Sequence, residues 1–388
     1  MEDLDHILTH QGEARKNYFN AMAPPIVQTS NFVFDTLDDF RTAFVDELSA
    51  HVYTRGNNPT NKILREKLAA LEGTEDALVF GSGAAAVAAA VIACVQSGDH
   101  IVCVQSPYSW TYKLLTLFLA RFGVSHTFVD GRSVAAIEAA IQPNTKLLYL
   151  ESPSSITFEL QDLAACTALA KERNLLTAID NSYASPIFQQ PSRWGIDLVI
   201  HSGTKYIAGH SDVVLGVVCA SKPLIQKIFN SEYMTLGAIL SPSDAFLAIR
   251  GLRTLRLRME RSDTSARYLI DRLAAHPRVE RVNYPFASDN PQRALAERQM
   301  SGAGGLFSVQ LKARNIAEME AFFHRLERFL LAVSWGGYES LALPFCAFYN
   351  VPNREDSTIP WNLVRFYIGL EDPEWLWKDL ERALVWPA

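Results

Sequence analysis

The chain has 388 residues, of which 48% are apolar, with a formal charge of −6 and a pI near 5.9. This length suffices for two or three domains around a large buried core. It carries no basic block that would bind nucleic acid or an anionic membrane surface, and no apolar run approaches the ~20 residues that span a bilayer, so we expect neither kind of partner.

Residues 1–60 are expected to form an N-terminal arm. The first 18 residues are acidic and polar, unlike a signal peptide, and 24-PPIVQTSNF-32 and 53-YTRGNNPTN-61 are irregular and rich in proline and asparagine. An arm with little core of its own packs on something else, such as another subunit. The five cysteines are scattered without a Cys-x-x-Cys pair, so we expect reduced thiols, no metal site and a cytoplasmic location.

Residues 61–240 are expected to form a large α/β domain. Its apolar runs are continuous, not alternating, and helical stretches such as 84–98 and 161–174 separate them, which predicts a mostly parallel sheet covered by helices on both faces. The seven predicted strands are 77–83, 100–105, 125–130, 146–152, 175–181, 197–203 and 213–220. Most of them end in small or polar residues, and ligands of such sheets bind beyond the strand ends.

Residues 241–388 are expected to form a smaller α+β domain. The pattern predicts a long helix through 244–276, a strand at 305–311, a helix at 316–331 and a strand at 363–370. The arginines of the first helix, in 249-IRGLRTLRLRMERS-262, have spacings typical of one helix with ion-paired side chains.

The segment 81-GSGAAA-86 follows the first predicted strand and precedes a helix. It matches the dinucleotide fingerprint G-x-G-x-x-A, and small residues at a helix N-terminus can bind a phosphate through backbone N–H groups. The next strand, however, ends in 104-VQSPYSW-110, without the carboxylate that would bind a ribose. We therefore expect Ser82, Gly83 and Ala84 to bind a phosphate, but not a dinucleotide.

Four further features at strand ends match pyridoxal 5′-phosphate (PLP). Asp180 closes an apolar strand, where a carboxylate needs a cationic partner, and Tyr108 offers a flat aromatic face. Lys205 lies in a loop with Ser202 and Thr204, whose hydroxyls can bind phosphate. A desolvated lysine has a lowered pKa, which formation of an imine with PLP requires. Each feature alone is more often structural, but together they favour a PLP site.

The segment Ser202–Tyr206, followed by 209-GHSD-212, resembles the lysine signature of the Cys/Met-metabolism PLP enzymes, the cystathionine γ-synthase/β-lyase family. The resemblance covers almost the whole chain and implies PLP fold type I, the aspartate-aminotransferase-like fold. The segment 53-YTRGNNPT-60 is similar to the family motif whose tyrosine and arginine reach the neighbouring subunit. It implies that Tyr53 and Arg55 contact the PLP phosphate across a dimer, and that two dimers form a tetramer.

The resemblance also implies roles for the C-terminal residues. In 363-LVRFYIGLED-372, Arg365 corresponds to the clamp for the substrate carboxylate, assisted by the backbone of Ser334 and Trp335 in 334-SWGGYESL-341. It assigns Lys205 as the base at Cα, Tyr108 as the residue that stacks on the ring, and Tyr53 as an aid to proton transfer.

Departures from the family pattern predict the reaction. Ser155 replaces an expected asparagine, and 151-ESPSSI-156 and 334-SWGGYESL-341 resemble proteobacterial cystathionine β-lyases. Val333 occupies a position that is often acidic in γ-lyases and γ-synthases. We therefore expect a β-lyase that cleaves cystathionine, or a similar cysteine thioether, to a thiol, pyruvate and ammonia. The alternatives are γ-chemistry in the same family, a nicotinamide oxidoreductase, and a binding protein that keeps the fold without catalysis.

Overall fold

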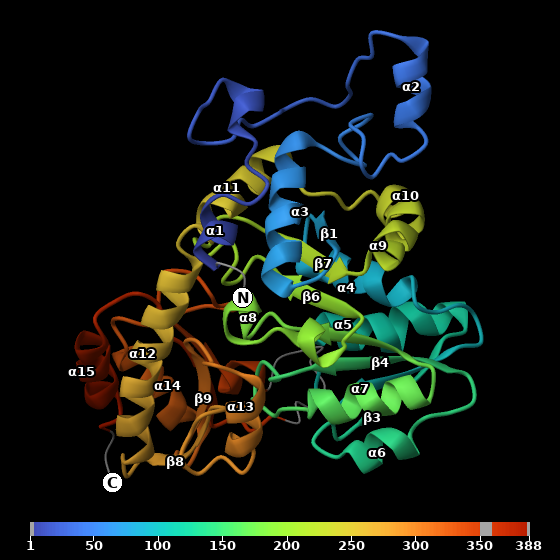
Figure 1. The fold of residues 1–388 in the computed structure, drawn as a ribbon. Helices are drawn as coiled ribbons and strands as arrows, with labels where there is room; N and C mark the ends of the chain where they lie inside the picture. Colours follow the sequence, from blue (N-terminus) through green and yellow to red (C-terminus); the bar gives the residue numbers. More distant parts are fainter. Residues whose placement is uncertain (1–3, 350–358, 386–388) are drawn as a thin grey trace.

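The protein is described from a computed structural model, which places residues 4–349 and 359–385. Two separate β-sheets organise the chain, one of seven strands and one of five (Figure 1). The expected α/β class with a smaller C-terminal α+β part is confirmed. The boundaries expected at residues 60 and 240 stay predictions. In the described part of the chain no helix is long and apolar enough to cross a bilayer.

The seven-stranded sheet has the order β1-β7-β6-β5-β4-β2-β3, and its strands are parallel except β7, which runs antiparallel to β1 and β6. Its strands are β1 (Asp76–Phe80), β2 (His100–Val104), β3 (Ser125–Val129), β4 (Thr145–Glu151), β5 (Leu176–Asp180), β6 (Leu198–Ser202) and β7 (Gly216–Ala220). All seven lie within or next to the predicted runs. The C-terminal ends of β1 to β6 and the N-terminal end of the antiparallel β7 lie at the same edge of the sheet. This edge carries the candidate site.

Helices cover both faces of this sheet, and alternate strand residues enter two separate cores. Leu78 and Phe80 pack in one core with α4 and α9, whereas Ala77 and Val79 pack in the other with α3, α7 and α11. The helical segments are α3 (Pro59–Glu72), α4 (Gly83–Ile92), α5 (Ser109–Lys113), η2 (Leu114–Phe118), η3 (Leu119–Phe122), α6 (Val134–Ala139), α7 (Leu163–Glu172), α8 (Ser185–Phe188), η4 (Pro191–Trp194), α9 (Lys222–Ile228), η5 (Phe229–Tyr233), α10 (Met234–Leu236) and α11 (Pro242–Leu252). Both faces of the inner strands are therefore buried, which explains their mostly apolar sequences, whereas the edge strand β3 is partly exposed and more polar.

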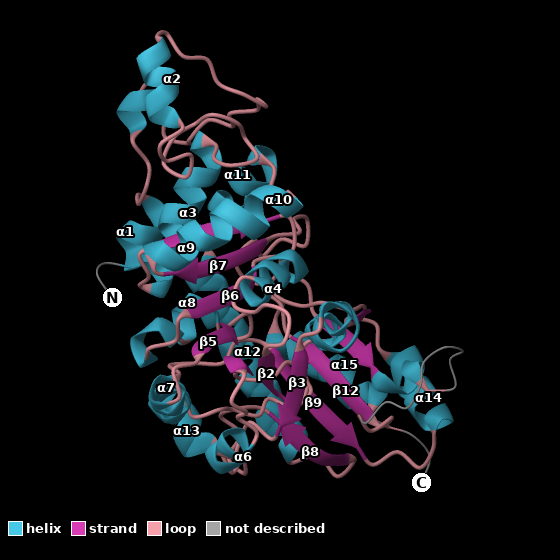
Figure 2. Cartoon of the chain, turned by 90° about the vertical axis from the view of Figure 1, so that its right-hand side faces the viewer, coloured by secondary structure: helices cyan, strands magenta, loops and turns pink. Residues whose placement is uncertain are grey.

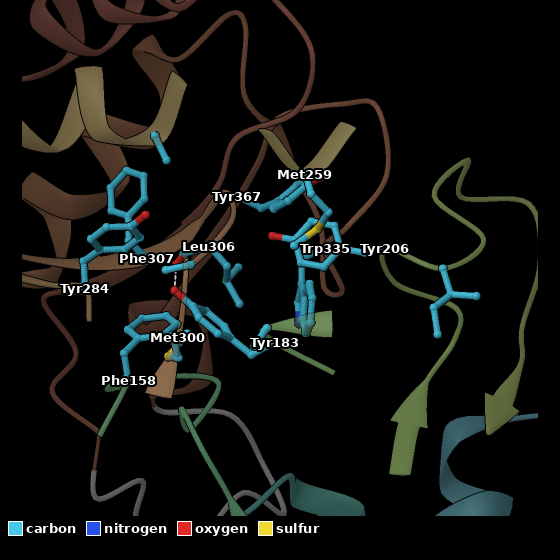
Figure 3. Packing of buried hydrophobic residues seen from close by; sticks show 14 of the residues in the cluster. Phe158, Tyr183, Tyr206, Met259, Tyr284, Met300, Leu306, Phe307, Trp335 and Tyr367 are labelled. Carbon is cyan, nitrogen blue, oxygen red and sulfur yellow. Dashed lines mark hydrogen bonds between the residues drawn. The ribbon is translucent and has the colours of Figure 1, made fainter. Parts of the chain in front are cut away.

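The five-stranded sheet has the order β10-β11-β12-β9-β8 and is mostly antiparallel. Its elements are α12 (Leu255–Ala274), β8 (Val279–Asn283), α13 (Arg293–Gln299), β9 (Leu306–Leu311), α14 (Ile316–Arg325), β10 (Leu330–Leu331), β11 (Leu341–Pro344), η6 (Phe345–Phe348), β12 (Leu363–Tyr367) and α15 (Pro373–Ala383). Aromatic residues of this sheet, such as Phe307, pack in the same core as Tyr183 and Tyr206, which follow β5 and β6 of the large sheet (Figure 3). The two sheets therefore share a continuous apolar core.

Two helices differ from the sequence prediction. The helix expected through 244–276 is broken between α11 and α12, where the carbonyl of Gly251 accepts a hydrogen bond from the guanidinium of Arg258 at 2.9 Å. The helix expected at 316–331 ends at Arg325, and the buried carboxylate of Asp379 accepts the backbone N–H groups of Glu327 and Arg328 just beyond it, at 2.8–3.1 Å. Asp379 is more than 50 residues away from the backbone groups that it binds, and Arg258 acts across a turn between two helices, so local periodicity reveals neither interruption.

The N-terminal arm contains α1 (Leu4–Thr9), η1 (Arg15–Tyr18) and α2 (Leu37–Ala43). Its α2 part projects from the rest of the molecule in both ribbon views (Figures 1 and 2). Several large apolar side chains in this part are more than two-thirds exposed, namely those of Phe19, Met22, Val33, Leu37 and Val45. Glu13, between α1 and η1, anchors the start of the arm through a fully buried ion pair with Lys67 Nζ at 3.1 Å. Farther along the arm, Thr60 and Asn58 bind the backbone of Pro25 and Val27.

Candidate active site

Lys205 lies in the loop that follows β6, where its side chain turns toward the C-terminal sheet. Its Nζ donates to Ser334 Oγ at 2.8 Å and lies 5.8 Å from the ring centre of Trp335. Burial and the charge of nearby Arg365, opposed by Asp180, lower the pKa of Lys205 to about 8. Near neutral pH a substantial fraction of this amine is therefore unprotonated and nucleophilic.

A buried arginine from α12 fixes the end of this loop. Arg258 donates to the carbonyl of Tyr206 at 2.8 Å, and burial lowers its pKa to about 10. A Cβ at Gly209, which has φ +69°, would lie 1.9 Å from Arg258 Nη1, so only glycine fits here. Arg258 thus departs from the expected ion-paired helix surface, because its partners are backbone carbonyls of the lysine loop and of α11.

The ends of β4, β5 and β6 bring acidic and polar groups together. Glu151 is paired with Asp180 in the sheet, and both carboxylates are more than 90% buried. Asp180 Oδ1 accepts the N–H of Ser182 at 2.9 Å. Burial and the charge of Asp180 raise the pKa of Glu151 to about 8. A protonated pyridine nitrogen is the kind of partner that a buried Asp180 requires.

A second buried network supports these strand ends from behind. Glu72, the last residue of α3, accepts from Asn181 at 3.0 Å and lies 2.6 Å from His201 Nε2. Asn181 follows Asp180 directly, and His201 precedes Ser202. The network therefore ties α3 to the two strands that present the candidate site residues.

Three small residues, Ser82, Gly83 and Ala84, lie where α4 begins, and we call them the phosphate cradle. Ser82 caps the helix by accepting the N–H of Ala85 at 3.1 Å, which leaves the first N–H groups of α4 facing outward from the helix end. A Cβ at Gly83 would lie 2.8 Å from both Cβ and Oγ of Ser202, so the glycine lets the backbone approach that hydroxyl. This arrangement fits a phosphate. Thr204 is different, since its hydroxyl is bonded to the backbone of Leu215, at 2.9 and 3.2 Å.

Tyr108 stands at the start of α5, and its side chain is 42% exposed. Its backbone N–H donates to Glu151 Oε2 at 2.7 Å, while Glu151 Oε1 accepts the N–H of Ser155 at 3.0 Å. Burial, with the charges of Asp180 and Glu151, raises the pKa of the Tyr108 hydroxyl. Sequence reasoning did not select Glu151 as a site residue, although its position in 151-ESPSSI-156 could have indicated it.

Arg365 lies on β12 and bridges the two parts of the molecule. It donates to the carbonyls of Ser155 at 3.2 Å and Ser334 at 3.3 Å, and burial lowers its pKa to about 10. Trp335 is buried against Tyr206, with ring centres 5.2 Å apart (Figure 3). A Cβ at Gly336 would lie 2.8 Å from Lys205 Cα, so this turn presses directly on the lysine loop.

Tyr53 and Arg55 do not join this group within one chain. Both side chains are exposed, and the guanidinium of Arg55 lies over the ring of Tyr53, 5.1 Å from its centre. They line a surface cavity of about 320 Å³ with residues of the arm and with Ile239. Within the described part of the chain, the other expected site residues therefore lie toward one edge of the sheet, whereas Tyr53 and Arg55 face outward.

The assembled groups fit PLP. They supply an amine of lowered pKa, a buried carboxylate, an aromatic face and a glycine-lined cradle at a helix start. The described residues contain no group of three or more histidine, cysteine, aspartate or glutamate side chains arranged to hold a metal ion.

Comparison with known proteins supports this interpretation. Residues 5–385 match the family model described as "Cys/Met metabolism PLP-dependent enzyme". The L-methionine gamma-lyase of Pseudomonas deceptionensis is 40% identical over 381 residues, covering 97% of this chain and 95% of that protein. The cystathionine gamma-lyase of Bacillus subtilis is 36% identical over 383 residues, covering 97% and 98%. The crystal structure of metB from Corynebacterium glutamicum superimposes with a TM-score of 0.90 at 33% identity, covering 98% of this chain and 97% of that one.

Proposed function

Because the chain belongs to the Cys/Met metabolism PLP-dependent enzyme family, we propose that it is a carbon–sulfur lyase that cleaves the Cγ–S bond of methionine or cystathionine. The observation that carries the proposal is the convergence of Lys205 and Arg365 on Ser334, which sets an amine beside a carboxylate clamp. Relatives that match along most of the chain, among them those from Pseudomonas deceptionensis, Mus musculus and Bacillus subtilis, are named gamma-lyases, which favours γ-cleavage over the β-cleavage expected from sequence motifs.

The residues that would hold PLP lie at the strand ends. We propose that the N–H groups of Gly83 and Ala84 and the hydroxyls of Ser82 and Ser202 bind the phosphate. Thr204 can join them only by releasing its bond to Leu215. Asp180 would pair with the pyridine nitrogen, Tyr108 would stack on the ring, and Lys205 would attach the cofactor.

The chemistry then follows from the residues around the substrate. When bound, PLP supplies the electron sink for cleavage at Cα and beyond. Arg365 binds the substrate carboxylate with two parallel N–H groups, which fixes Cα near Lys205. The amine of Lys205 would remove the Cα proton and, once it has passed that proton on, a proton from Cβ, because expulsion of the thiol from Cγ needs an electron pair at Cβ. Tyr108, whose raised pKa keeps its hydroxyl protonated, can donate to the leaving thiolate.

β-Cleavage remains a second candidate because of the residues next to the clamp. Val333, directly before Ser334, is 69% exposed and offers no charge to the distal ammonium of cystathionine. The carbonyl of Ser155, where related enzymes carry asparagine, is occupied by Arg365. Val333, the serine at position 155 and the resemblance of 151-ESPSSI-156 and 334-SWGGYESL-341 to β-lyases predict pyruvate as the product. Of these features, Val333 concerns the far end of the substrate.

We propose that the active unit is a homodimer in which Tyr53 and Arg55 complete the site of the neighbouring subunit, and that two dimers form a tetramer. The exposed apolar side chains of the arm support burial against another copy. Co-expressing Lys205→Ala and Arg55→Ala chains tests this. Each variant alone is expected to be inactive, whereas mixed dimers regain activity at the one site that has both residues. Mixtures that stay inactive, although mixed dimers form, would contradict shared sites.

The lyase proposal is tested with the purified holoenzyme and methionine. The expected products are methanethiol, 2-oxobutyrate and ammonia in equal amounts, and Lys205→Ala is expected to release none of them. A wild-type protein that binds PLP but releases no thiol from methionine or cystathionine would refute it.

The five free cysteines support the proposed cytoplasmic location of this enzyme.

A further inference from the structure

We propose that Glu151 is a positioning residue that holds the stacking residue Tyr108 and the clamp Arg365 in a fixed relation to each other. The inference rests on the proposed function, because these two residues act together only on a PLP-bound substrate. Glu151 itself need not touch cofactor or substrate. Its effect would be to keep the ring-binding side and the carboxylate-binding side of the site aligned.

The first support is the pair of hydrogen bonds that Glu151 makes to two separate loops. Its Oε2 accepts the N–H of Tyr108 at 2.7 Å, and its Oε1 accepts the N–H of Ser155 at 3.0 Å. The side chain of Glu151 is buried. Glu151 is the last residue of β4, where it is paired with Asp180 of β5. A rigid strand end therefore fixes the start of α5 and the loop after β4 at once.

The second support is the continuation of these contacts to the reactive lysine. The carbonyl of Ser155 accepts from Arg365 Nη1 at 3.2 Å, and Arg365 Nη2 donates to the carbonyl of Ser334 at 3.3 Å. The hydroxyl of Ser334 accepts from Lys205 Nζ at 2.8 Å. One continuous chain of bonds thus runs from Tyr108 through Glu151 and Arg365 to Lys205.

The third support is the choice of a carboxylate at this position. Burial and the charge of Asp180 raise the pKa of Glu151 to about 8, so an acid at this place costs folding free energy, while each of its two oxygens keeps an acceptor lone pair in either protonation state. A glutamine would avoid this cost, but its amide has a single acceptor oxygen and would turn its NH₂ toward one of the two backbone N–H groups. Only a carboxylate of this length accepts both bonds. The arrangement therefore favours alignment of the two loops over stability.

The test compares Glu151→Gln and Glu151→Asp holoenzymes with wild type. The matched control is Glu138→Gln, which removes the charge of an exposed glutamate paired with Arg173. Three quantities are measured: the thermal midpoint, the visible circular dichroism of bound PLP, and kcat and KM for the thioether substrate. We expect both Glu151 variants to bind PLP with an altered dichroic band, since the face of Tyr108 shifts. We also expect kcat/KM to fall roughly 10- to 100-fold, because small misplacements of positioned groups cost this much.

A folded Glu151→Gln enzyme with the wild-type dichroic band and kcat/KM within twofold of wild type would overturn the proposal. If Glu151→Gln does not fold, Glu151→Asp decides in the same way, since it keeps the charge but is too short to accept both N–H groups. The control is expected to match wild type in all three quantities. Failure of the proposed function looks different, because the wild-type protein itself would then lack the PLP band or release no thiol.

Discussion

Replacing Arg365 with lysine is expected to weaken substrate binding while leaving the cofactor in place. The guanidinium is held by the carbonyls of Ser155 and Ser334, which direct its remaining N–H groups toward one position. A lysine keeps the charge but loses the planar fork, so the substrate carboxylate loses about one charge-assisted hydrogen bond. Such a bond contributes roughly 1.5–3 kcal/mol, which corresponds to about a 10- to 150-fold loss in kcat/KM.

The assay is steady-state thiol release by the Arg365→Lys holoenzyme, with PLP content measured by its visible absorbance. The loss should reside in KM, because the carboxylate is bound equally before and during the reaction. Arg261→Lys is the matched control, since Arg261 is exposed on α12 and donates to the carbonyl of Glu371. It is expected to stay within twofold of wild type. An Arg365→Lys enzyme with unchanged KM, or with the loss confined to kcat, would refute the clamp assignment.

Three further predictions address the cofactor cradle and its support. Because burial lowers the pKa of Lys205 to about 8, roughly 10% of its amine is neutral at pH 7. The rate at which borohydride traps added PLP on the apoenzyme should therefore rise as the pH increases through about 8. A trapping rate that is flat between pH 6 and 9 would contradict this. Gly83→Ala places a Cβ 2.8 Å from Ser202 Oγ, and the resulting 1–3 kcal/mol of overpacking predicts PLP affinity about 5- to 150-fold weaker by absorbance titration; unchanged affinity would show that the cradle does not bind the phosphate. Glu72→Ala leaves buried donors such as His201 without their acceptor and should lower the free energy of unfolding in urea by at least about 1–3 kcal/mol, whereas a change below about 0.5 kcal/mol would mean that the network is not structural.

The large sheet and its functional edge could be predicted because the signal is local. Most strands of the large sheet are dominated by apolar residues, and polar residues stand at their ends, as Asp180 does in β5; the edge strand β3 is the polar exception. Helical periodicity located helices such as α4 and α7, which overlap the predicted stretches 84–98 and 161–174, but not the ends of every helix. The cofactor followed from residue types at those ends, and the family match confirms it.

The features that sequence reasoning missed depend on contacts between distant residues. Arg258, at the break between α11 and α12, also binds the carbonyl of Tyr206 in the lysine loop, and Asp379, at the end of α14, binds backbone groups about 50 residues away. Glu151 was overlooked because its two partners, in separate loops, are revealed only by the folded backbone. The expectation of β-cleavage depends on single positions beside the clamp, such as Val333. The residue type at such a position gives the local charge but does not give the shape of the substrate pocket.

The most direct test of the central claim is product analysis with cystathionine. Its two C–S bonds lead to different products, so one reaction mixture distinguishes the candidate reactions. The proposed γ-cleavage predicts cysteine, 2-oxobutyrate and ammonia from the PLP-loaded enzyme, and none of them from Lys205→Ala. Homocysteine and pyruvate as the main products would contradict γ-cleavage and restore the β-lyase assignment, and the absence of any keto acid from both cystathionine and methionine would contradict the lyase itself.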